Sequence, residues 1–223
     1  MQKSPMLTRR ALTLIGAGAL AVLQLAGPAL AQAPANTVIS AADQALVDRA
    51  VAYLESLGEA QGRFVQTDAR GRSVTGELFL KRPGKARFAY DPPSGLLVVS
   101  DGDLVSVLDK RLKTFEVYPL GTTPLSLFLA RTIRLDKGVQ VTRVTRMSDG
   151  FSVTARDGKK ETAGSIALTF SDGPLALAGW TVTDAQSRPT RVQLLDLRPA
   201  SGLDRSLFVL KDPRPKNVGR GKS

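Results

Sequence analysis

The side chains that could carry out chemistry in this sequence are carboxylates, hydroxyls, lysines and arginines, because the chain contains no cysteine and no histidine. That absence excludes disulfides, zinc fingers, thiolate nucleophiles and histidine-dependent triads, together with most transition-metal sites. No Walker loop, nucleophile elbow, dinucleotide-binding glycine motif or calcium-binding loop is present either. We therefore expect no catalytic residue, no cofactor and no metal.

Several carboxylates stand beside glycines in predicted turns, namely Asp101, Asp103, Asp149, Asp157 and Asp172. Aspartate side chains often accept hydrogen bonds from nearby backbone N–H groups in turns, and this role explains their positions without catalysis. Two carboxylates brought together by the fold could in principle hydrolyse a glycosidic bond. A small secreted hydrolase working with carboxylates therefore remains the least favoured alternative function.

Residues 1–31 have the pattern of a cleaved secretion signal. A basic start is followed by an apolar stretch over 11–25 and by a small-residue cleavage site at 29–31. The apolar stretch falls short of the roughly 20 residues that a membrane-spanning helix needs. Its adjacent arginines fit a twin-arginine export route as well as an ordinary Sec signal. We predict an exported, soluble protein with a mature part at 32–223, and a cut after Ala33 is the alternative.

The mature part is basic, with a net charge of +8 compared with +11 for the whole chain, because the signal carries three basic and no acidic residues. Aromatic residues are only 5% and no nucleic-acid motif is present, so we expect no nucleic-acid partner. Basic residues concentrate near the C-terminus, at Lys211, Arg214, Lys216, Arg220 and Lys222. We predict a flexible, solvated tail, and attraction to an anionic membrane or an acidic partner is the alternative.

Helical periodicity is confined to two segments. Ser40 and Asp43 have the spacing of a capping box, and apolar residues recur at helical intervals behind them, which predicts a helix over 41–57. A second, short apolar helix is predicted over 123–130, with Thr123 as its N-cap and proline as its first residue. A helix that is apolar nearly all round must be covered on most sides.

Between and after these helices the hydrophobic period changes to two. About eleven short strands separated by Gly, Pro and Asp turns are predicted, the last of them over 206–210. An antiparallel sheet of that size curls strongly or closes. The mature chain is therefore predicted to be mainly β, a single domain over 32–223 whose antiparallel sheet curls into a barrel or half-barrel.

The most distinctive sequence block is GELFLKRPGKARFAYDPP at 76–93. Together with LVVSDG at 97–102, GRFVQ at 62–66, YPL at 118–120 and PL at 124–125, it resembles the periplasmic outer-membrane lipoprotein carrier family, LolA. The resemblance spans essentially the whole mature chain and is most specific in the Lys-Arg-Pro-Gly motif.

This resemblance implies an incomplete barrel whose apolar concave face is covered by helices. It further implies a non-enzymatic, monomeric chaperone that accepts triacylated lipoproteins from an inner-membrane ABC-type release complex and delivers them to an outer-membrane acceptor. Each acyl methylene left in water costs about 0.8 kcal/mol, so such cargo cannot cross an aqueous compartment alone. A lipid-sensing or lipoprotein-sensing envelope-stress protein of the same fold is the alternative, although 192 mature residues leave little room for the additional domain often found there.

Site residues follow from the same resemblance combined with period-two alternation. The residues expected to line the acyl-chain cavity are Phe64, Leu78, Leu80, Phe88, Tyr90, Leu97 and Val99. Packing in an ordinary core is the alternative explanation for each of them. The lid is expected to present Leu46, Tyr53, Leu57, Leu127 and Phe128 to the cavity, and a buried structural helix is the alternative for the 123–130 segment.

Arg82 is the residue that the resemblance singles out as a latch, bonding backbone groups of the lid to keep the empty cavity shut. A guanidinium in an apolar lining needs partners, and it offers five donors in a rigid fork. An arginine that merely reaches solvent from a strand end is the alternative. The neighbouring Pro83, Lys85 and Ala86 lie in the loop that engages the release complex in the family, where a bulky apolar residue often replaces Ala86.

Overall fold

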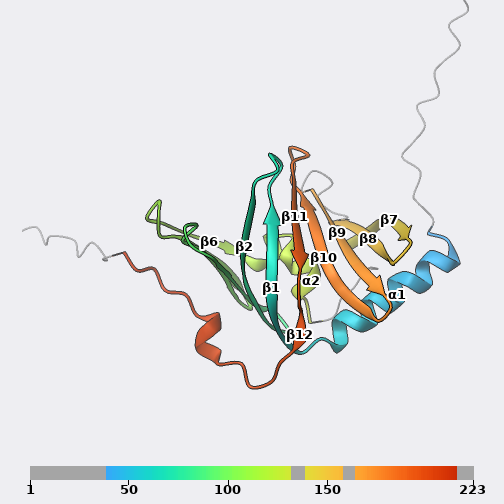
Figure 1. Ribbon diagram of the computed structural model, residues 1–223, viewed down its shortest axis with the longest axis horizontal. Coiled ribbons are helices and arrows are strands. Elements are labelled where there is room, and N and C mark those ends of the chain that lie inside the picture. The colour runs from blue at the N-terminus through green and yellow to red at the C-terminus, as the bar shows by residue number, and fades with distance from the viewer. Residues whose placement is uncertain (1–38, 132–138, 158–163, 215–223) are drawn as a thin grey trace, which may run out of the picture. The chain divides into compact units, whose positions relative to one another are not determined.

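The computed structural model describes residues 39–131, 139–157 and 164–214 (Figure 1). The predicted signal peptide lies outside the described residues. The described chain is built from short elements in this order: α1 (Ala41–Ser56), β1 (Glu59–Thr67), β2 (Ser73–Lys81), β3 (Lys85–Tyr90), β4 (Leu96–Asp101), β5 (Leu104–Asp109), β6 (Thr114–Pro119), the 3-10 helix η1 (Leu120–Thr122), α2 (Leu125–Leu129), β7 (Val139–Met147), β8 (Gly150–Asp157), β9 (Ser165–Asp172), β10 (Leu175–Thr183), β11 (Pro189–Leu194), β12 (Arg198–Pro199) and the 3-10 helix η2 (Arg205–Phe208).

These strands form one antiparallel sheet of twelve strands, in the order β6-β5-β4-β3-β2-β1-β11-β10-β9-β8-β7, with β12 pairing to the end of β1. The junction between β1 and β11 joins the early strands to the late ones. Over the described residues β6 and β7 are the two ends of the sheet and do not pair with each other, so the barrel is open. The predicted fold class, an incomplete antiparallel barrel with helices on one face, is confirmed.

Helix α1 begins where the capping box predicts. The Ser40 hydroxyl accepts a hydrogen bond from the Asp43 N–H at 3.1 Å, which satisfies one of the free donors of the first turn. The apolar stripe then buries Leu46, Val47, Ala50 and Leu54. Figure 1 shows α1 running beside the late strands, and it contacts β7, β8 and β10. The helix stops at Ser56, one residue before the predicted end.

Helix α2 is shorter than predicted and begins differently. It covers Leu125–Leu129 rather than 123–130, and Pro124 occupies the N-cap position without a side-chain cap. The Thr123 hydroxyl, predicted to cap the helix, instead donates to the carbonyl of Leu120 at 2.8 Å. The preceding 3-10 turn therefore competes for the hydroxyl that the sequence pattern assigned to α2.

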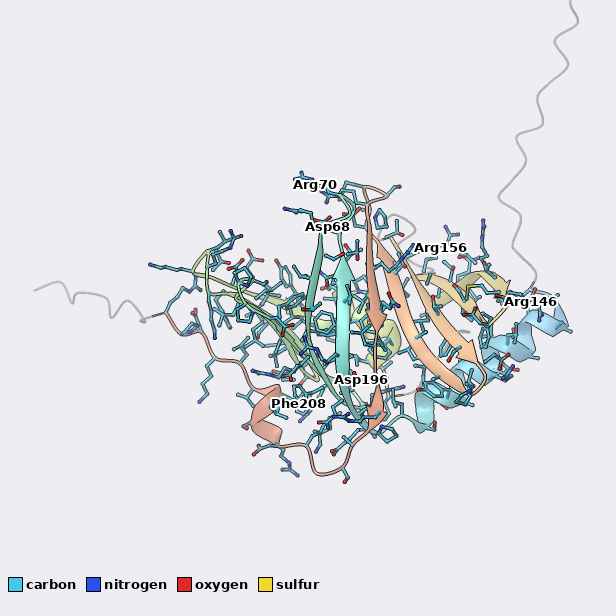
Figure 2. The ribbon with its side chains drawn as sticks, viewed as in Figure 1. Asp68, Arg70, Arg146, Arg156, Asp196 and Phe208 are labelled. Atoms are coloured by element: carbon cyan, nitrogen blue, oxygen red, sulfur yellow. The ribbon has the colours of Figure 1, made fainter. Side chains whose placement is uncertain are left out.

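The prediction of a last strand over 206–210 is wrong. This segment contains the 3-10 helix η2, which is capped by Asp204 through a 2.7 Å bond from the Ser206 N–H. Its Phe208 is buried, and η2 contacts β3 and β4 (Figure 2). η2 covers the convex face of β3 and β4. Apolar residues in this segment are therefore buried against that face and do not form one face of a strand.

The main core lies between the concave face of the sheet and the two helices. An almost continuous chain of aromatic rings runs through it. Phe128 of α2 stacks on Trp180 of β10 at 5.4 Å between ring centroids, and Trp180 meets Phe88 edge to face at 6.0 Å. On the α1 side, Tyr53 meets Phe170 edge to face at 5.9 Å. Each helix is thus fixed to the sheet through one aromatic contact.

Candidate functional site

A cavity of about 260 Å³ lies on the concave face under α2. Its walls come from β1, β3, β4, β10 and β11, and one α2 residue completes them. The lining residues are Gln66, Phe88, Tyr90, Val98, Leu125, Trp180, Val182, Thr190 and Val192. Most of these side chains are apolar or aromatic, so the cavity suits a hydrocarbon group and offers few groups for chemistry.

Two of the predicted lining residues, Phe88 and Tyr90, border this cavity. Phe64, Leu78 and Leu80 lie on the same face but have no exposed surface at all. The ring of Phe64 packs edge to face against Phe88 and Tyr90, at 5.7 and 5.1 Å between centroids. These three residues are packed in the main core, and they are not among the residues that line the cavity.

Leu97 and Val99 were predicted to line the cavity, and the structure places them on the opposite face. The strand register pairs Phe88 with Val98, so Val98 shares the concave face with Phe88. Val99 pairs with Arg87, whose guanidinium donates to the Leu207 carbonyl beside η2 at 3.2 Å. Both faces of β4 are covered, so its run of apolar residues did not reveal which side faces the cavity.

The late strands supply lining residues that sequence analysis missed. Trp180 pairs with Val192 and Val182 pairs with Thr190, so all four side chains share one face of β10 and β11. The signal was present in the sequence as period-two spacing at 180/182 and 190/192, together with the single tryptophan of the chain. The sequence blocks that carry the family resemblance all lie before residue 126, so the resemblance did not point to these positions.

One polar pair stands at the edge of the apolar cavity. The Tyr90 hydroxyl donates to the Gln66 side-chain oxygen at 2.7 Å. Burial raises the pKa of the Tyr90 phenol to about 12, and the hydrogen bond to Gln66 acts in the opposite direction. The phenol is therefore neutral at all physiological pH values and serves as a donor that orients Gln66.

Arg82 bridges the two helices. Its guanidinium donates to the Leu54 carbonyl in the last turns of α1 and, at 2.6 Å, to the Ala130 carbonyl directly after α2. The Arg82 Nε is buried and has no hydrogen-bond partner within the described ranges. Burial lowers the pKa of Arg82, and the nearby charge of Glu55 partly offsets that effect. The contacts are those that a latch requires.

The residues predicted to form the lid differ in their surroundings. Leu46 and Leu57 are buried at α1 and just beyond its end, and Tyr53 is half-buried against Phe170. Phe128 of α2 is fully buried. The side chain of Leu127 lies outside the described part of the structure.

The loop predicted to dock a partner follows β2. Pro83 is exposed and Lys85 is half-buried, whereas Ala86 is fully buried in the main core. Ala86 therefore cannot contact a partner while the helices cover the sheet. The backbone of the same loop supports α2, because the Gly84 N–H donates to the Leu129 carbonyl at 2.8 Å.

Comparison with known families gives this geometry its context. The family model described as outer membrane lipoprotein carrier protein LolA matches residues 55–211. The chain belongs to the LolA family. Members of this family are lipoprotein carriers with a half-barrel fold, and the matched range contains every strand of the sheet, α2 and Arg82.

Among LolA relatives, the outer-membrane lipoprotein carrier protein of Chromohalobacter salexigens is 28% identical over 183 residues, covering 78% of this chain and 86% of the relative. The protein of the same name from Azotobacter vinelandii is 25% identical over 206 residues, covering 88% and 96%. A crystal structure of a LolA superfamily protein from Nitrosomonas europaea aligns with a TM-score of 0.44 at 9% identity, covering 73% and 97%. Within the described residues, no helix has the length and hydrophobicity needed to cross a bilayer.

Proposed function

We propose that this protein carries lipoproteins across the periplasm by shielding their acyl chains on the concave face of the sheet. The observation that supports this most directly is an apolar cavity roofed by α2, with a single arginine joining α2 to α1. LolA carriers are not enzymes, and a carrier needs an apolar hollow without a reactive group. Transfer of acyl chains out of water supplies the binding free energy, at about 0.8 kcal/mol per methylene.

The cavity in its present form is smaller than its proposed cargo requires. Its volume of about 260 Å³ is below the roughly 300 Å³ at which pockets for drug-sized ligands begin. A triacylated cargo is larger than such a ligand. We therefore propose that α2, which contributes Leu125 to the roof, moves away from β10 when the acyl chains enter.

Arg82 is the residue proposed to control that movement. In the closed form its two carbonyl acceptors come from different helices, so loss of this side chain releases both connections at once. The closed form also leaves the buried Nε unpaired and removes the guanidinium from water, which disfavours closure. Closed and open states of similar free energy are what a carrier that must both bind and release its cargo requires.

The proposed route begins with export and removal of residues 1–31, which leaves a monomeric mature protein at 32–223 in the periplasm. The carrier then takes triacylated lipoproteins from an ABC-type release complex of the inner membrane and passes them to an outer-membrane acceptor. The exposed Pro83 and half-buried Lys85 are proposed to contact the release complex, since their loop supports α2 through Gly84. Docking at this loop could thereby loosen the lid.

Release of lipoproteins from spheroplasts tests this function. The purified mature protein is added to spheroplasts of a host lacking its own carrier, and the soluble fraction is examined by native mass spectrometry. An acylated polypeptide bound to the protein supports the carrier function. Lipid binding without any release of lipoproteins would instead favour the sensor.

The latch is tested by Arg82→Leu, with Arg205→Leu as a matched control because Arg205 lies in η2 on the opposite face. Arg82→Leu is expected to fold normally, to bind acyl chains and to fail in transfer to acceptor membranes. The control is expected to transfer normally. Unchanged transfer by Arg82→Leu would contradict the latch.

A further inference from the structure

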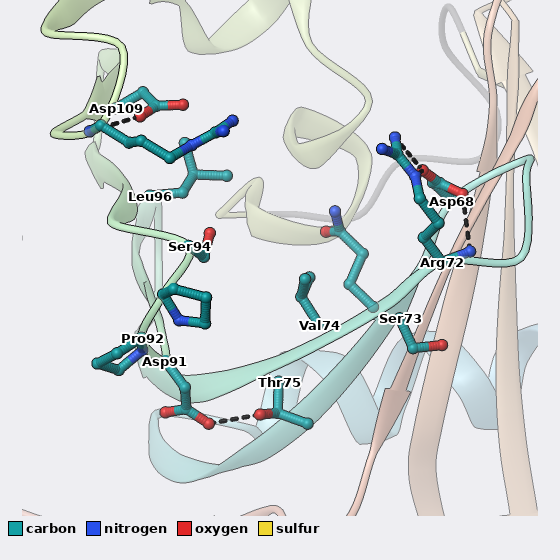
Figure 3. A pocket seen from close by; sticks show the side chains of 13 residues that line it. Asp68, Arg72, Ser73, Val74, Thr75, Asp91, Pro92, Ser94, Leu96 and Asp109 are labelled. Carbon is teal, nitrogen blue, oxygen red and sulfur yellow. Dashed lines mark hydrogen bonds and ion pairs between the residues drawn. The ribbon is translucent and has the colours of Figure 1, made fainter.

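A second cavity, of about 570 Å³, lies near the turn that joins β1 to β2, beside the first cavity. Its lining residues are Gln66, Asp68, Arg72, Ser73, Val74, Thr75, Asp91, Pro92, Pro93, Ser94, Leu96, Asp109 and Arg111. Figure 3 shows Val74 in the middle of this pocket, with the Asp68–Arg72 pair on one side and Leu96 and Asp109 on the other. Gln66 lines both cavities, so the two adjoin at this residue.

The second cavity occupies a notch in the sheet. Strand β2 begins at Ser73, but its pairing with β3 ends at Gly76, which lies opposite Tyr90. The three residues Ser73–Thr75 therefore extend past the end of β3, while their pairing with β1 continues to Ser73. After Tyr90, Asp91 still lies beside Thr75, and the chain then turns away through Pro92–Ser94, so Ser73 and Val74 form a short free strand edge.

Two hydrogen bonds show toward which neighbouring strand each backbone group of this edge points. The Arg72 carbonyl accepts from the Asp68 N–H at 3.0 Å, on the β1 side. The Thr75 carbonyl accepts from the Asp91 N–H at 2.9 Å, on the β3 side. Since alternate residues face the same neighbour, Ser73 and Thr75 both direct their backbone groups into the notch. Across the described ranges, the Ser73 N–H and carbonyl and the Thr75 N–H have no backbone partner.

The charged side chains around the notch are largely paired already. Asp68 pairs with Arg72, and the Asp91 carboxylate accepts from both Thr75 and Arg63. The Asp109 carboxylate accepts from backbone N–H groups of its own turn. What remains for a ligand is the free backbone edge and the guanidinium of Arg111, flanked by apolar walls from Val74, the two prolines and Leu96. Such a surface suits an extended peptide that adds as a strand.

We propose that this notch binds the peptide that follows the acylated residue of the cargo, as a short extended segment paired with the backbone of Ser73. The inference rests on the proposed function. In a lipoprotein the acyl chains and the polypeptide meet at one residue, so acyl chains held in the first cavity place the start of the peptide near its border. Gln66 forms that border with the notch.

Synthetic lipopeptides test this proposal with the mature protein. The probes are tripalmitoylated S-glyceryl-cysteine alone, the same compound extended by Ser-Ser-Asn-Ala, and the extended compound with N-methylated amides at the second and third added residues. Two added hydrogen bonds, to the N–H and the carbonyl of Ser73, should tighten binding of the extended probe about tenfold over the other two. Equal affinity for all three would overturn the inference while leaving the carrier function intact. If none bound, the carrier function itself would fail, and this inference with it.

A matched pair of variants locates the effect. Ser73→Pro removes the N–H that faces the notch, and proline is tolerated in a strand where its nitrogen faces away from the ladder. Ser73→Ala keeps that N–H and removes only the hydroxyl, which contacts Thr67. Ser73→Pro is expected to lose the tenfold advantage of the extended probe, and Ser73→Ala to keep it. Circular dichroism and unchanged affinity for the unextended probe establish that Ser73→Pro is folded.

The unacylated peptide distinguishes the proposed cargo from other partners. Ser-Ser-Asn-Ala without acyl chains should bind at least a thousandfold more weakly than the lipopeptide, because acyl burial supplies most of the affinity. Equally tight binding of the free peptide would overturn the proposal, since the notch would then serve a protein partner independently of the acyl cavity.

Discussion

The two helices on the concave face are held in different ways. α1 has sixteen residues and buries four apolar side chains. Two ion pairs join it to the sheet, Arg49 with Asp172 and Asp43 with Arg146, the last of which is labelled in Figure 2. α2 has five residues and none of them is charged. Its buried side chains hold α2 on the sheet. In addition, the Gly84 N–H and the Arg82 guanidinium donate hydrogen bonds to the carbonyls of Leu129 and Ala130 at its C-terminal end.

This difference assigns separate tasks to the two helices in the proposed carrier. The contacts of α1 are distributed along four turns, so no single event releases it. The hydrogen bonds at the end of α2 both come from the β2–β3 loop, so a change in that loop removes both of them and leaves the aromatic stack and the buried side chains. We therefore treat α1 as a fixed wall and α2 as the movable part, and each prediction below tests this distinction.

The largest expected effect is on global stability. Leu54 of α1 is almost fully buried, so Leu54→Ala should lower the free energy of unfolding by about 3 kcal/mol. Phe128 of α2 is equally buried. Phe128→Ala should nevertheless lower the free energy of unfolding by less than about 1 kcal/mol, because this decrease cannot exceed the free energy with which α2 docks on the sheet. Urea denaturation measures both values. Equal losses would show that α2 is an integral part of the core.

Tyr90 provides a titration that reports on the roof. Burial raises the pKa of its phenol from 10 to about 12, so its neutral form stabilises the folded state below pH 10, and this contribution is lost as the pH rises through 12. Absorbance at 295 nm should show an ionisation near pH 12 that Tyr90→Phe removes, and that variant keeps Tyr118, whose pKa is also raised by its hydrogen bond to Glu116. The same step should move toward pH 10 in Arg82→Leu if α2 opens. A normal pKa in the intact protein would mean that the roof is already open.

Arg82 should affect α2 more strongly than α1. Removal of its hydrogen bonds by Arg82→Leu should speed amide exchange about tenfold over 125–130, since each bond contributes about 1 kcal/mol. Exchange over 44–50 should stay unchanged, because the ion pairs and apolar face of α1 are intact. Trp180, which stacks on Phe128 and is the only tryptophan, offers a second readout through acrylamide quenching. Uniform acceleration in both helices would contradict a division into fixed and movable parts.

Sequence analysis predicted most of the fold and part of the site. The capping box at Ser40 fixed the start of α1, and turns marked by Gly and Pro fixed the early strands, because these signals are local. The 3-10 helix η2 was misread as a strand, since burial of Phe208 depends on a sheet surface built by distant residues. Local pattern contains no information about such a surface.

The site shows the same division. Phe88 and Tyr90 alternate with polar or small neighbours, so their face could be predicted. Leu97 and Val99 lie in a strand that is apolar on both faces, where hydropathy cannot distinguish the two sides and only the register does. The bond from Arg82 to Ala130 joins positions 48 residues apart, and it could be anticipated only through the resemblance to a family.

The smallest expected effect concerns the ion pairs of α1. The hydrogen bond and charge of Arg49 lower the pKa of Asp172, and Ser40 and Arg146 lower the pKa of Asp43. A lowered carboxyl pKa stabilises the folded state above the ordinary value of 3.8, and that contribution is lost as the pH falls below it. Both pairs are exposed to solvent, so their effect is small and weakens with salt.

Asp172→Asn should therefore melt slightly below the unmodified protein at pH 6, and the difference should shrink as the pH falls below 3.8, because the stabilising carboxylate becomes protonated. Asp212→Asn is the control, because its partner Arg214 lies beyond η2 and does not touch α1. Scanning calorimetry at pH 6 and pH 2 measures the melting temperatures. If Asp172→Asn instead opened the acyl cavity, as judged by Trp180 quenching, α1 would be a movable cover like α2, and the contrast between the helices would have to be abandoned.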